Sequence, residues 1–245
     1  MSVHLSVNIN KAATLRNSRG GNNPNLLQLA LDCIRFGAEG ITVHPRPDER
    51  HIRRSDVREL APVLTVEFNM EGNPMEKEFT ELVLSVKPAQ VTLVPDGTRQ
   101  LTSDHGWDVV RERGYLTDTV ALFREAGIRT SLFLDPNPKM VEAAIQTGTD
   151  RIELYTEAYA RLYPHNLGLA LKPYVEAAEV ALAGQVGLNA GHDLSLHNLS
   201  HLVRELPGLL EVSIGHALFC DALYFGLENT IRMYLRAIRQ GIVVA

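Results

Sequence analysis

Short apolar runs alternate with longer amphipathic segments along the whole chain. In the first run, apolar Val3, Leu5, Val7 and Ile9 alternate with smaller or polar residues, which is the pattern of a half-buried strand. Runs of this kind predict strands at 3–10, 41–44, 66–70, 90–94, 128–134, 151–154, 186–189 and 210–214. The segments between them predict helices at 24–35, 55–64, 74–86, 108–126 and 138–147, one ending at 182, and a last one carrying Leu223, Leu227, Ile231, Leu235 and Ile238.

Eight strands that alternate with helices through short glycine-containing links predict a parallel sheet closed into a barrel. We therefore expect an α/β fold, a (β/α)₈ TIM barrel, with residues 1–245 forming one domain of a size that such barrels routinely reach. An open, doubly wound sheet is the alternative, but it normally shows fewer units and a glycine-rich fingerprint after its first strand. Here the first strand ends in Asn-Ile-Asn-Lys, which favours the barrel.

The bulk properties narrow the class of protein. A formal net charge of −5 argues against a general nucleic-acid surface. Cys33 and Cys220, the two cysteines, both lie in apolar helical patterns, which predicts buried free thiols in a reduced compartment. Residues 1–10 lack the basic start and long apolar core of a signal peptide, and no apolar run is long enough to cross a bilayer. We expect a cytoplasmic protein with neither nucleic-acid nor membrane partners.

Two consecutive units near the end of the chain share a Gly-His turn. The stretches VGLNAGHDL, at 186–194, and LEVSIGHAL, at 210–218, each end an apolar strand in Gly-His where a helix is expected to begin. Glycine lets the backbone approach a ligand, and the first N–H groups of a helix have no partners inside it. In a (β/α)₈ barrel, the loops after the last two strands frequently build a phosphate site. The two turns therefore predict phosphate binding.

Polar residues at the carboxyl ends of the strands should converge on one mouth of the barrel. They are Asn8, Asn10, Lys11, His44, Arg46, Glu71, Asp96, Asp135, Glu153, Asn189, His192 and His216. Glu71 ends a strand with little other charge nearby, so we expect a raised pKa and a role as general base. Glu153 is similar, although a structural pairing with Arg151 or another arginine of the barrel is the alternative. Asp96 and Asp135 are interpreted as turn formers.

The loop HPRPDERH, at 44–51, places two histidines and two arginines directly after a strand. Guanidinium groups suit phosphate oxygens, and histidine suits proton transfer near neutral pH. Residues 11–25 are expected to form a polar, basic loop in which Arg16 and Arg19 could hold a second anion. No His-x-His follows the first strand and no His-Glu-x-x-His occurs, so the spacing gives little support for a metal site. The residues favour a metal-free acid–base enzyme that acts on a phosphate ligand.

Seven stretches stand out along the chain, in this order: VNIN…ATLRNSRG, GITVHPRPDERHI, FNMEGNP, SLFLD, IELYTEAYA, GLNAGHDLSLHN and SIGHAL. Together they resemble the pyridoxine 5′-phosphate synthase family of vitamin B6 biosynthesis along essentially the whole chain. The resemblance implies a TIM barrel with extra helices that assembles as a homo-octamer, a tetramer of dimers. It implies a transferase-class, ring-closing condensation of 3-amino-2-oxopropyl phosphate with 1-deoxy-D-xylulose 5-phosphate, which yields pyridoxine 5′-phosphate, inorganic phosphate and water. It implies no metal and no organic cofactor.

The same resemblance implies roles for individual residues. His44 and Glu71 match proton acceptors, His192 matches a proton donor, and Glu153 matches a carboxylate that stabilises the transition state. The positions matching those that hold the amino-ketone phosphate are Asn8, Arg19, Asp193, Gly215 and His216. The positions matching those that hold the deoxyxylulose phosphate are Arg46, His51 and Thr102. The loop at 95–107 resembles a lid over bound substrates.

Two positions depart from the family. Asn10-Lys11 stands where many members have Asp-His, a pair that touches the sugar phosphate, so the proton-transfer capacity of that histidine is absent here. Asp193 replaces a glycine found in some members; if only its backbone N–H binds phosphate, its carboxylate must point away. Two other functions stay open. One is an isomerase or aldolase acting on a single sugar phosphate, with Glu71 as base or Lys11 as Schiff-base former. The other is a non-catalytic sensor of a phosphate ligand.

Overall fold

A computed structural model describes residues 2–97, 100 and 103–243, and within these residues eight parallel strands close into a barrel. Each strand pairs with the next in sequence, and β8 returns to pair with β1. The strands are β1 (His4–Asn8), β2 (Gly40–Val43), β3 (Glu67–Gly72), β4 (Gln90–Leu93), β5 (Arg129–Leu134), β6 (Arg151–Tyr155), β7 (Gly187–Gly191) and β8 (Leu209–Ile214). The predicted TIM barrel is confirmed.

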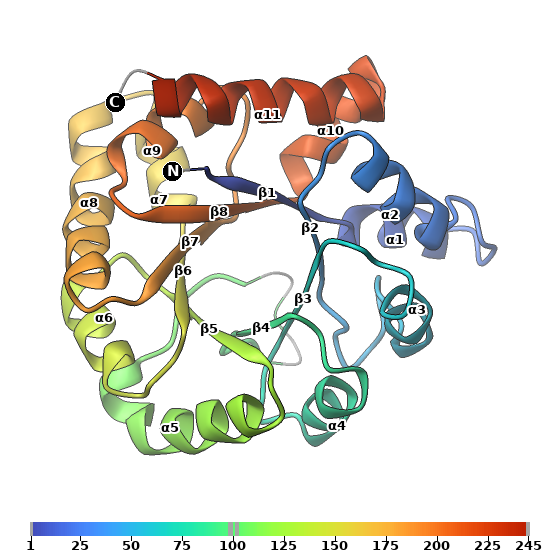
Figure 1. Ribbon diagram of the computed structural model, residues 1–245. Helices are drawn as coiled ribbons and strands as arrows, with labels where there is room; N and C mark the ends of the chain where they lie inside the picture. The colour runs from blue at the N-terminus through green and yellow to red at the C-terminus, as the bar shows by residue number, and fades with distance from the viewer. Residues whose placement is uncertain (1, 98–99, 101–102, 244–245) are drawn as a thin grey trace.

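Helices surround the strands, as Figure 1 shows in a view along the barrel. They are α1 (Asn10–Asn17), α2 (Leu26–Arg35), α3 (Arg54–Leu60), α4 (Lys77–Val86), α5 (Val109–Glu125), α6 (Pro138–Ile145), α7 (Glu157–Leu162), α8 (Leu167–Ala183), α9 (Leu199–Glu205), α10 (His216–Phe225) and α11 (Leu227–Val243). Several begin where an Asn or Asp side chain accepts a hydrogen bond from a free N–H of the first turn. Asn25 caps α2, Asp108 caps α5 and Asn166 caps α8 in this way.

The two faces of the strands have different chemistry. Apolar side chains such as Leu5, Val7 and Ile41 are fully buried and belong to the core between the barrel and its helices. The alternate residues carry polar groups into the barrel, where Ser6 Oγ and Thr42 Oγ1 are 2.7 Å apart and Thr42 Oγ1 accepts from Asn69 Nδ2 at 3.3 Å. The interior is therefore polar beneath the mouth, although branched apolar residues usually fill such barrels.

The segment after β1 differs from the prediction. Residues 11–25 were expected to form a loop, yet α1 occupies Asn10–Asn17. Ala12 and Ala13 are good helix formers and are buried, so packing compensates for the polar composition of the segment. Arg16 also lies inside, where its guanidinium donates to both carboxylate oxygens of Asp56, at 2.6 and 2.9 Å. Arg16 is thus a structural residue, and the expectation that it could hold an anion is wrong.

Three further predictions need correction. The predicted last helix is two helices, because Gly226 adopts a φ of 76° that ends α10 and redirects the chain into α11. No helix starts at Asp193: His192 and Asp193 both have positive φ, so the chain turns there and α9 begins only at Leu199. Cys33 is buried as expected, but Cys220 is exposed, because α10 carries it away from the core.

Candidate active site

A cavity of about 440 Å³ opens at the carboxyl ends of the strands. It brings together most of the predicted site residues: Asn8, Asn10, Lys11, His44, Arg46, His51, Glu71, His192, Asp193, Gly215 and His216. They come from β1, α1, β3, α10 and the turns after β2, β7 and β8, which are far apart in sequence. The residues chosen for their positions at the carboxyl ends of strands therefore meet at one mouth of the barrel, as expected for this fold.

Glu71 lies at the end of β3 and is almost completely buried. Burial raises the pKa of its carboxyl to about 8, and the charge of Asp96 adds to this effect. Glu71 Oε2 accepts a hydrogen bond from Asn8 Nδ2 at 3.3 Å and lies 3.9 Å from His44 Nδ1. A carboxyl with a pKa near neutrality, held by an amide donor next to an imidazole, is suited to exchanging protons with a bound molecule.

His44 follows β2 and is held by its backbone. Its N–H donates to Asn10 Oδ1 at 2.9 Å, and the N–H of Asn10 donates to Asn8 Oδ1 at 3.1 Å. Burial and the neighbouring charge of Arg46 keep the pKa of His44 well below its usual range, so the ring is neutral at pH 7. Asn10 thus has a clear structural task here: it fixes the strand end that carries His44.

The His192 ring sits on the turn after β7. Thr156 Oγ1 donates to the carbonyls of Gly191, at 2.8 Å, and of His192, which ties the turn to the end of β6. The ring packs against Tyr155 and Phe133, with centroids 5.2 and 5.3 Å away. Burial lowers the pKa of His192 to about 4, and the charges of Arg46 and Lys11 act in the same direction. A neutral, well-oriented imidazole therefore faces the cavity.

Glu153 is buried below the mouth and is not among the residues that line the cavity. Burial and the proximity of Glu71 raise its pKa well above the usual range. A Cβ at position 191 would overlap Glu153 Oε1, so Gly191 provides the space for this carboxyl. The alternative pairing with Arg151 does not occur, because Arg151 Nη1 faces Glu211 at 3.5 Å and Asn189 at 3.1 Å at the other end of the barrel.

Arg46 is buried at the cavity and forms an ion pair with Asp96. Ser103 Oγ donates to the same Asp96 carboxylate at 2.7 Å, and Asn73 Nδ2 donates to the Asp96 carbonyl at 3.0 Å. Asp96 was interpreted as a turn former; that interpretation is incomplete, because its carboxylate holds Arg46. Asp135 lies in a turn, where its carbonyl accepts from the N–H of Asn137 at 2.7 Å, but its carboxylate also accepts from the N–H of Gly106 at 3.2 Å and so holds a distant segment.

The other side of the cavity is formed by the start of α10. Gly215 is the N-cap, and Gly215, His216 and Ala217 all line the cavity, so the unpaired N–H groups of the first turn lie at its wall. Such a helix end favours an anion. Burial and the charge of Glu157 raise the pKa of Asp193, whereas His216 acts in the opposite direction.

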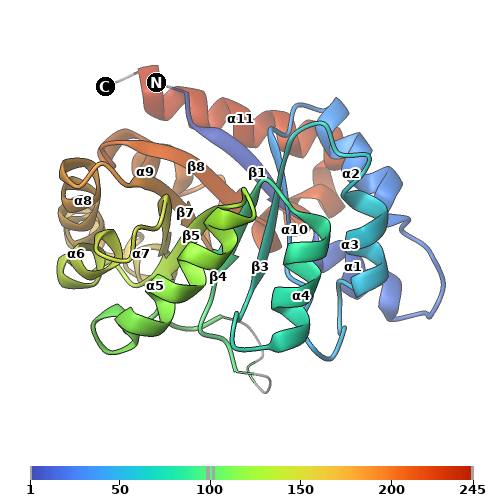
Figure 2. The same cartoon turned by 60° about the horizontal axis from the view of Figure 1, so that its bottom comes forward.

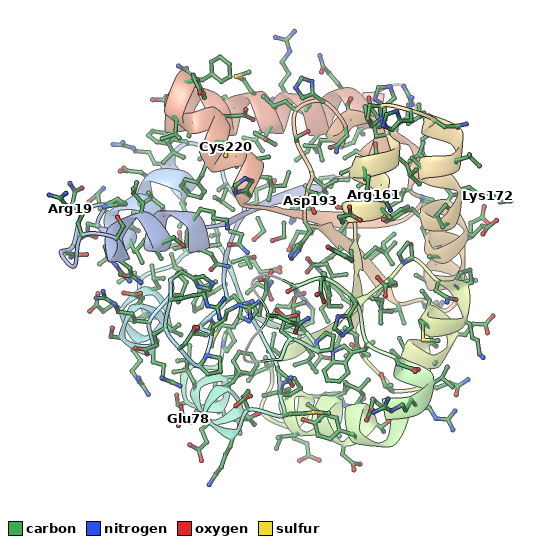
Figure 3. The ribbon with its side chains drawn as sticks, turned by 180° about the vertical axis from the view of Figure 1, so that it is seen from behind. Arg19, Glu78, Arg161, Lys172, Asp193 and Cys220 are labelled. Carbon is green, nitrogen blue, oxygen red and sulfur yellow. The ribbon has the colours of Figure 1, made fainter. Side chains whose placement is uncertain are left out.

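One predicted residue, Arg19, does not line the cavity. Arg19 is exposed in the loop after α1, and Figure 3 shows it at the periphery of the molecule, far from Asp193 at the strand ends. Thr102 lies outside the described residues. Sequence reasoning also missed cavity residues, notably Tyr155, Arg50 and Ser213. Arg50 belongs to the loop at 44–51, which the sequence analysis had singled out, and Tyr155 stands one residue beyond the predicted end of its strand. Counting more residues after each predicted strand as site candidates would have found both.

Among the residues that the structure describes, no group of three or more His, Cys, Asp or Glu side chains is arranged to hold a metal ion. No described helix has the length and apolar character needed to span a membrane.

Known structures share the fold. Two crystal structures of phosphoribosylanthranilate isomerase from Thermotoga maritima superpose with TM-scores of 0.58 and 0.55, and each alignment covers 97% of this chain and 98% of the other. Sequence identities of 13% and 15% limit this likeness to the fold.

Sequence comparison reaches further. The proteins named pyridoxine 5′-phosphate synthase from Cytophaga hutchinsonii and Phocaeicola vulgatus are 58% and 60% identical over 238 and 235 residues. The matches cover 97% and 96% of this chain, and 100% and 98% of the relatives. The profile of the family described as pyridoxal phosphate biosynthesis protein PdxJ matches residues 5–240. The chain belongs to this PdxJ family and is one of its enzymes.

Proposed function

We propose that this chain is a pyridoxine 5′-phosphate synthase that condenses 3-amino-2-oxopropyl phosphate with 1-deoxy-D-xylulose 5-phosphate. The observation that carries the proposal is the pairing of Glu71, with its pKa near 8, and neutral His44 in a cavity that also offers cationic side chains and a helix N-terminus. Ring closure between two phosphorylated substrates needs groups that transfer protons and groups that hold the substrates in fixed positions. This cavity provides both kinds of group. The products would be pyridoxine 5′-phosphate, inorganic phosphate and water.

Two regions of the cavity suit the two phosphates. The amino-ketone phosphate would lie at Gly215 and His216, where the first turn of α10 offers free N–H groups. The sugar phosphate would lie at Arg46 and His51, because a guanidinium matches phosphate oxygens in charge and shape. Arg19 and Thr102 stay predictions for these two sites.

In the proposed sequence of steps, the substrate amine attacks the ketone and water leaves with the help of a protonated histidine. A carboxylate then removes a carbon-bound proton next to the imine, phosphate is eliminated, and an aldol-type addition closes the ring. Loss of water and of a last proton makes the ring aromatic. His44 would accept a proton as the neutral imidazole, and Glu71 would accept one in its ionised form, which a pKa of about 8 leaves as the minor form at neutral pH. His192 would donate a proton, while Glu153 would stabilise charge from below the mouth.

The low pKa of His192 constrains this proposal, because a proton donor should be charged when it acts. Apart from burial, Arg46 and Lys11 are the groups that lower this pKa. A phosphate dianion between these cations would offset their charge and raise the pKa of the histidine. We therefore propose that the substrate itself makes His192 a usable acid.

We further propose that the enzyme is a cytoplasmic homo-octamer without a cofactor, as the family resemblance implies. Leu223 and Tyr224 at the end of α10 are 79% and 85% exposed, and Leu15 on the adjacent α1 is 58% exposed. Large exposed apolar side chains on neighbouring helices are typical of a surface that contacts another protein. Light scattering on the purified protein tests this assembly, and a monomer at micromolar concentration would contradict it.

The proposed activity is tested by incubating the purified protein with both phosphates and following the absorbance of pyridoxine 5′-phosphate. We expect product only when both substrates are present. Glu125→Gln, which changes an exposed carboxyl at the end of α5, serves as a matched control for Glu71→Gln. Absence of product from well-folded protein would refute the proposal. A covalent adduct on Lys11 after borohydride treatment with one sugar phosphate would favour an aldolase instead.

A further inference from the structure

A second hollow, with a volume of about 930 Å³, lies between α2, α9 and α11. Phe36, just before β2, and Arg204, just before β8, both line it, so it belongs to the amino-terminal end of the barrel. The candidate active site lies at the opposite end. Figures 1 and 2 show α11 crossing the molecule between α9 and α2, at the end of the barrel where β1 starts. No step of the proposed reaction uses this region.

Four arginines surround the hollow: Arg204, Arg232, Arg236 and Arg239. Arg232 pairs with Glu228 on its own helix at 2.5 Å, and Arg204 pairs with its neighbour Glu205 at 2.9 Å. Within the described part of the chain, Arg236 and Arg239 form no ion pair with a carboxylate. The hollow therefore holds an excess of positive charge in a chain whose net charge is −5. Grouped like charges repel, and a bound anion would relieve that repulsion.

The rest of the lining is apolar or neutral. Phe36 and Leu235 are half-buried in the wall, and Ser200 and Gln240 add hydrogen-bonding groups. Leu235 is held closely, because a Cβ at Gly37 would come within 2.8 Å of Leu235 Cδ1. The Arg35 guanidinium stacks over the Phe36 ring at 4.9 Å. The hollow thus combines an anchored apolar wall with guanidinium groups along one side.

From this combination we propose that the hollow is a second ligand site, which binds an organic phosphate carrying a flat apolar ring. The guanidinium groups of Arg236 and Arg239 bind the phosphate oxygens, because their planar forks match that geometry. The ring of the ligand lies against Phe36 and Leu235. The volume is within the range of small-molecule sites. The proposal goes beyond the reaction at the mouth and does not depend on it.

Calorimetric titration in magnesium-free, low-salt buffer tests the proposal, with adenosine 5′-triphosphate as the probe. Adenosine and inorganic triphosphate are titrated in parallel to separate the contributions of ring and charge. We expect one saturable site per chain for the nucleotide, weaker binding of inorganic triphosphate and none of adenosine. The Arg236→Gln/Arg239→Gln double variant should weaken nucleotide binding about tenfold or more, since two charge-assisted contacts are lost.

The matched control is Arg111→Gln/Arg113→Gln, which removes two arginines from the outer surface of α5. This variant should bind the nucleotide as the natural protein does, and both double variants should turn over the two phosphate substrates at unchanged rates. Equal losses of nucleotide binding in both variants, or binding of inorganic triphosphate as tight as that of the nucleotide, would overturn the proposal. So would a change of mass by light scattering in the Arg236/Arg239 variant, because the hollow would then be an interface between copies.

Discussion

Replacing Glu71 with glutamine should stabilise the folded protein, and the gain should grow as the pH rises. The pKa of Glu71 is about 8 in the folded chain and near the ordinary 4.5 in the unfolded chain. Between these two values the unfolded carboxyl is ionised while the folded one stays protonated. The unfolded state therefore becomes more favourable with rising pH, and the natural protein loses stability over this window. Glutamine does not ionise, and its side-chain oxygen can still accept the hydrogen bond from Asn8.

The magnitude follows from the same two pKa values. Each pH unit between them costs the folded state about 1.4 kcal/mol, so a window from 4.5 to about 8 gives an upper bound of about 5 kcal/mol. Relaxation around the charged carboxylate reduces this figure. We expect the difference in unfolding free energy between Glu71→Gln and the natural protein to increase by at least about 2 kcal/mol from pH 5 to pH 8.

Urea unfolding at pH 5, 6, 7 and 8 measures this difference, with the protein concentration held constant because assembly also contributes to stability. The natural protein, Glu71→Gln and the control Glu125→Gln are compared. A difference between Glu71→Gln and the natural protein that does not change with pH would refute the reasoning. It would mean that the folded carboxyl ionises as easily as the unfolded one, and the case for Glu71 as a base near neutral pH would weaken with it.

Three further predictions test other parts of the site. His192→Asn should leave the circular dichroism spectrum intact and lower turnover by roughly 10²–10⁴, the range for a lost general acid or base; a near-natural rate would exclude a catalytic role. Gly215→Val should lower the thermal midpoint and selectively weaken the binding of the amino-ketone phosphate, because a Cβ there meets the Asn8 carbonyl at 3.0 Å. Equal changes in the apparent affinities of both substrates would show that the turn has a structural role only. Arg16→Met should cost about 3–5 kcal/mol of unfolding free energy, because the buried Asp56 carboxylate loses its cation and keeps only the N–H of Arg53 as a donor; a loss below about 1 kcal/mol would show that water reaches the carboxylate.

The sequence alone determined the barrel and the residues at its strand ends. Alternating apolar positions mark a strand wherever one face is buried, and a parallel strand must then be followed by a connection long enough to hold a helix. Glu71 and His44 could be placed at the mouth because each stands at the carboxyl end of such a strand. These patterns involve residues that are close together along the chain, so the amino-acid sequence alone is enough to recognise them.

Only the tertiary structure decided which charges meet. Asp96 is a turn residue by its sequence neighbours, yet it pairs with Arg46, fifty positions away. Arg16 belongs to a stretch that reads as a polar loop, and the partner that buries it, Asp56, is forty positions away. Side-chain pairing of this kind depends on distances across the fold, which periodicity does not encode.

The same holds for the proton affinities at the mouth. The pKa of Glu71 is raised and that of His192 is lowered, mainly because the barrel excludes water from both groups, and each shift favours the uncharged form. Burial is a property of the closed fold, and each value also depends on neighbouring charges brought in from other strands. The sequence could name these two residues as acid–base candidates, but the closed barrel decided that both are uncharged near neutral pH.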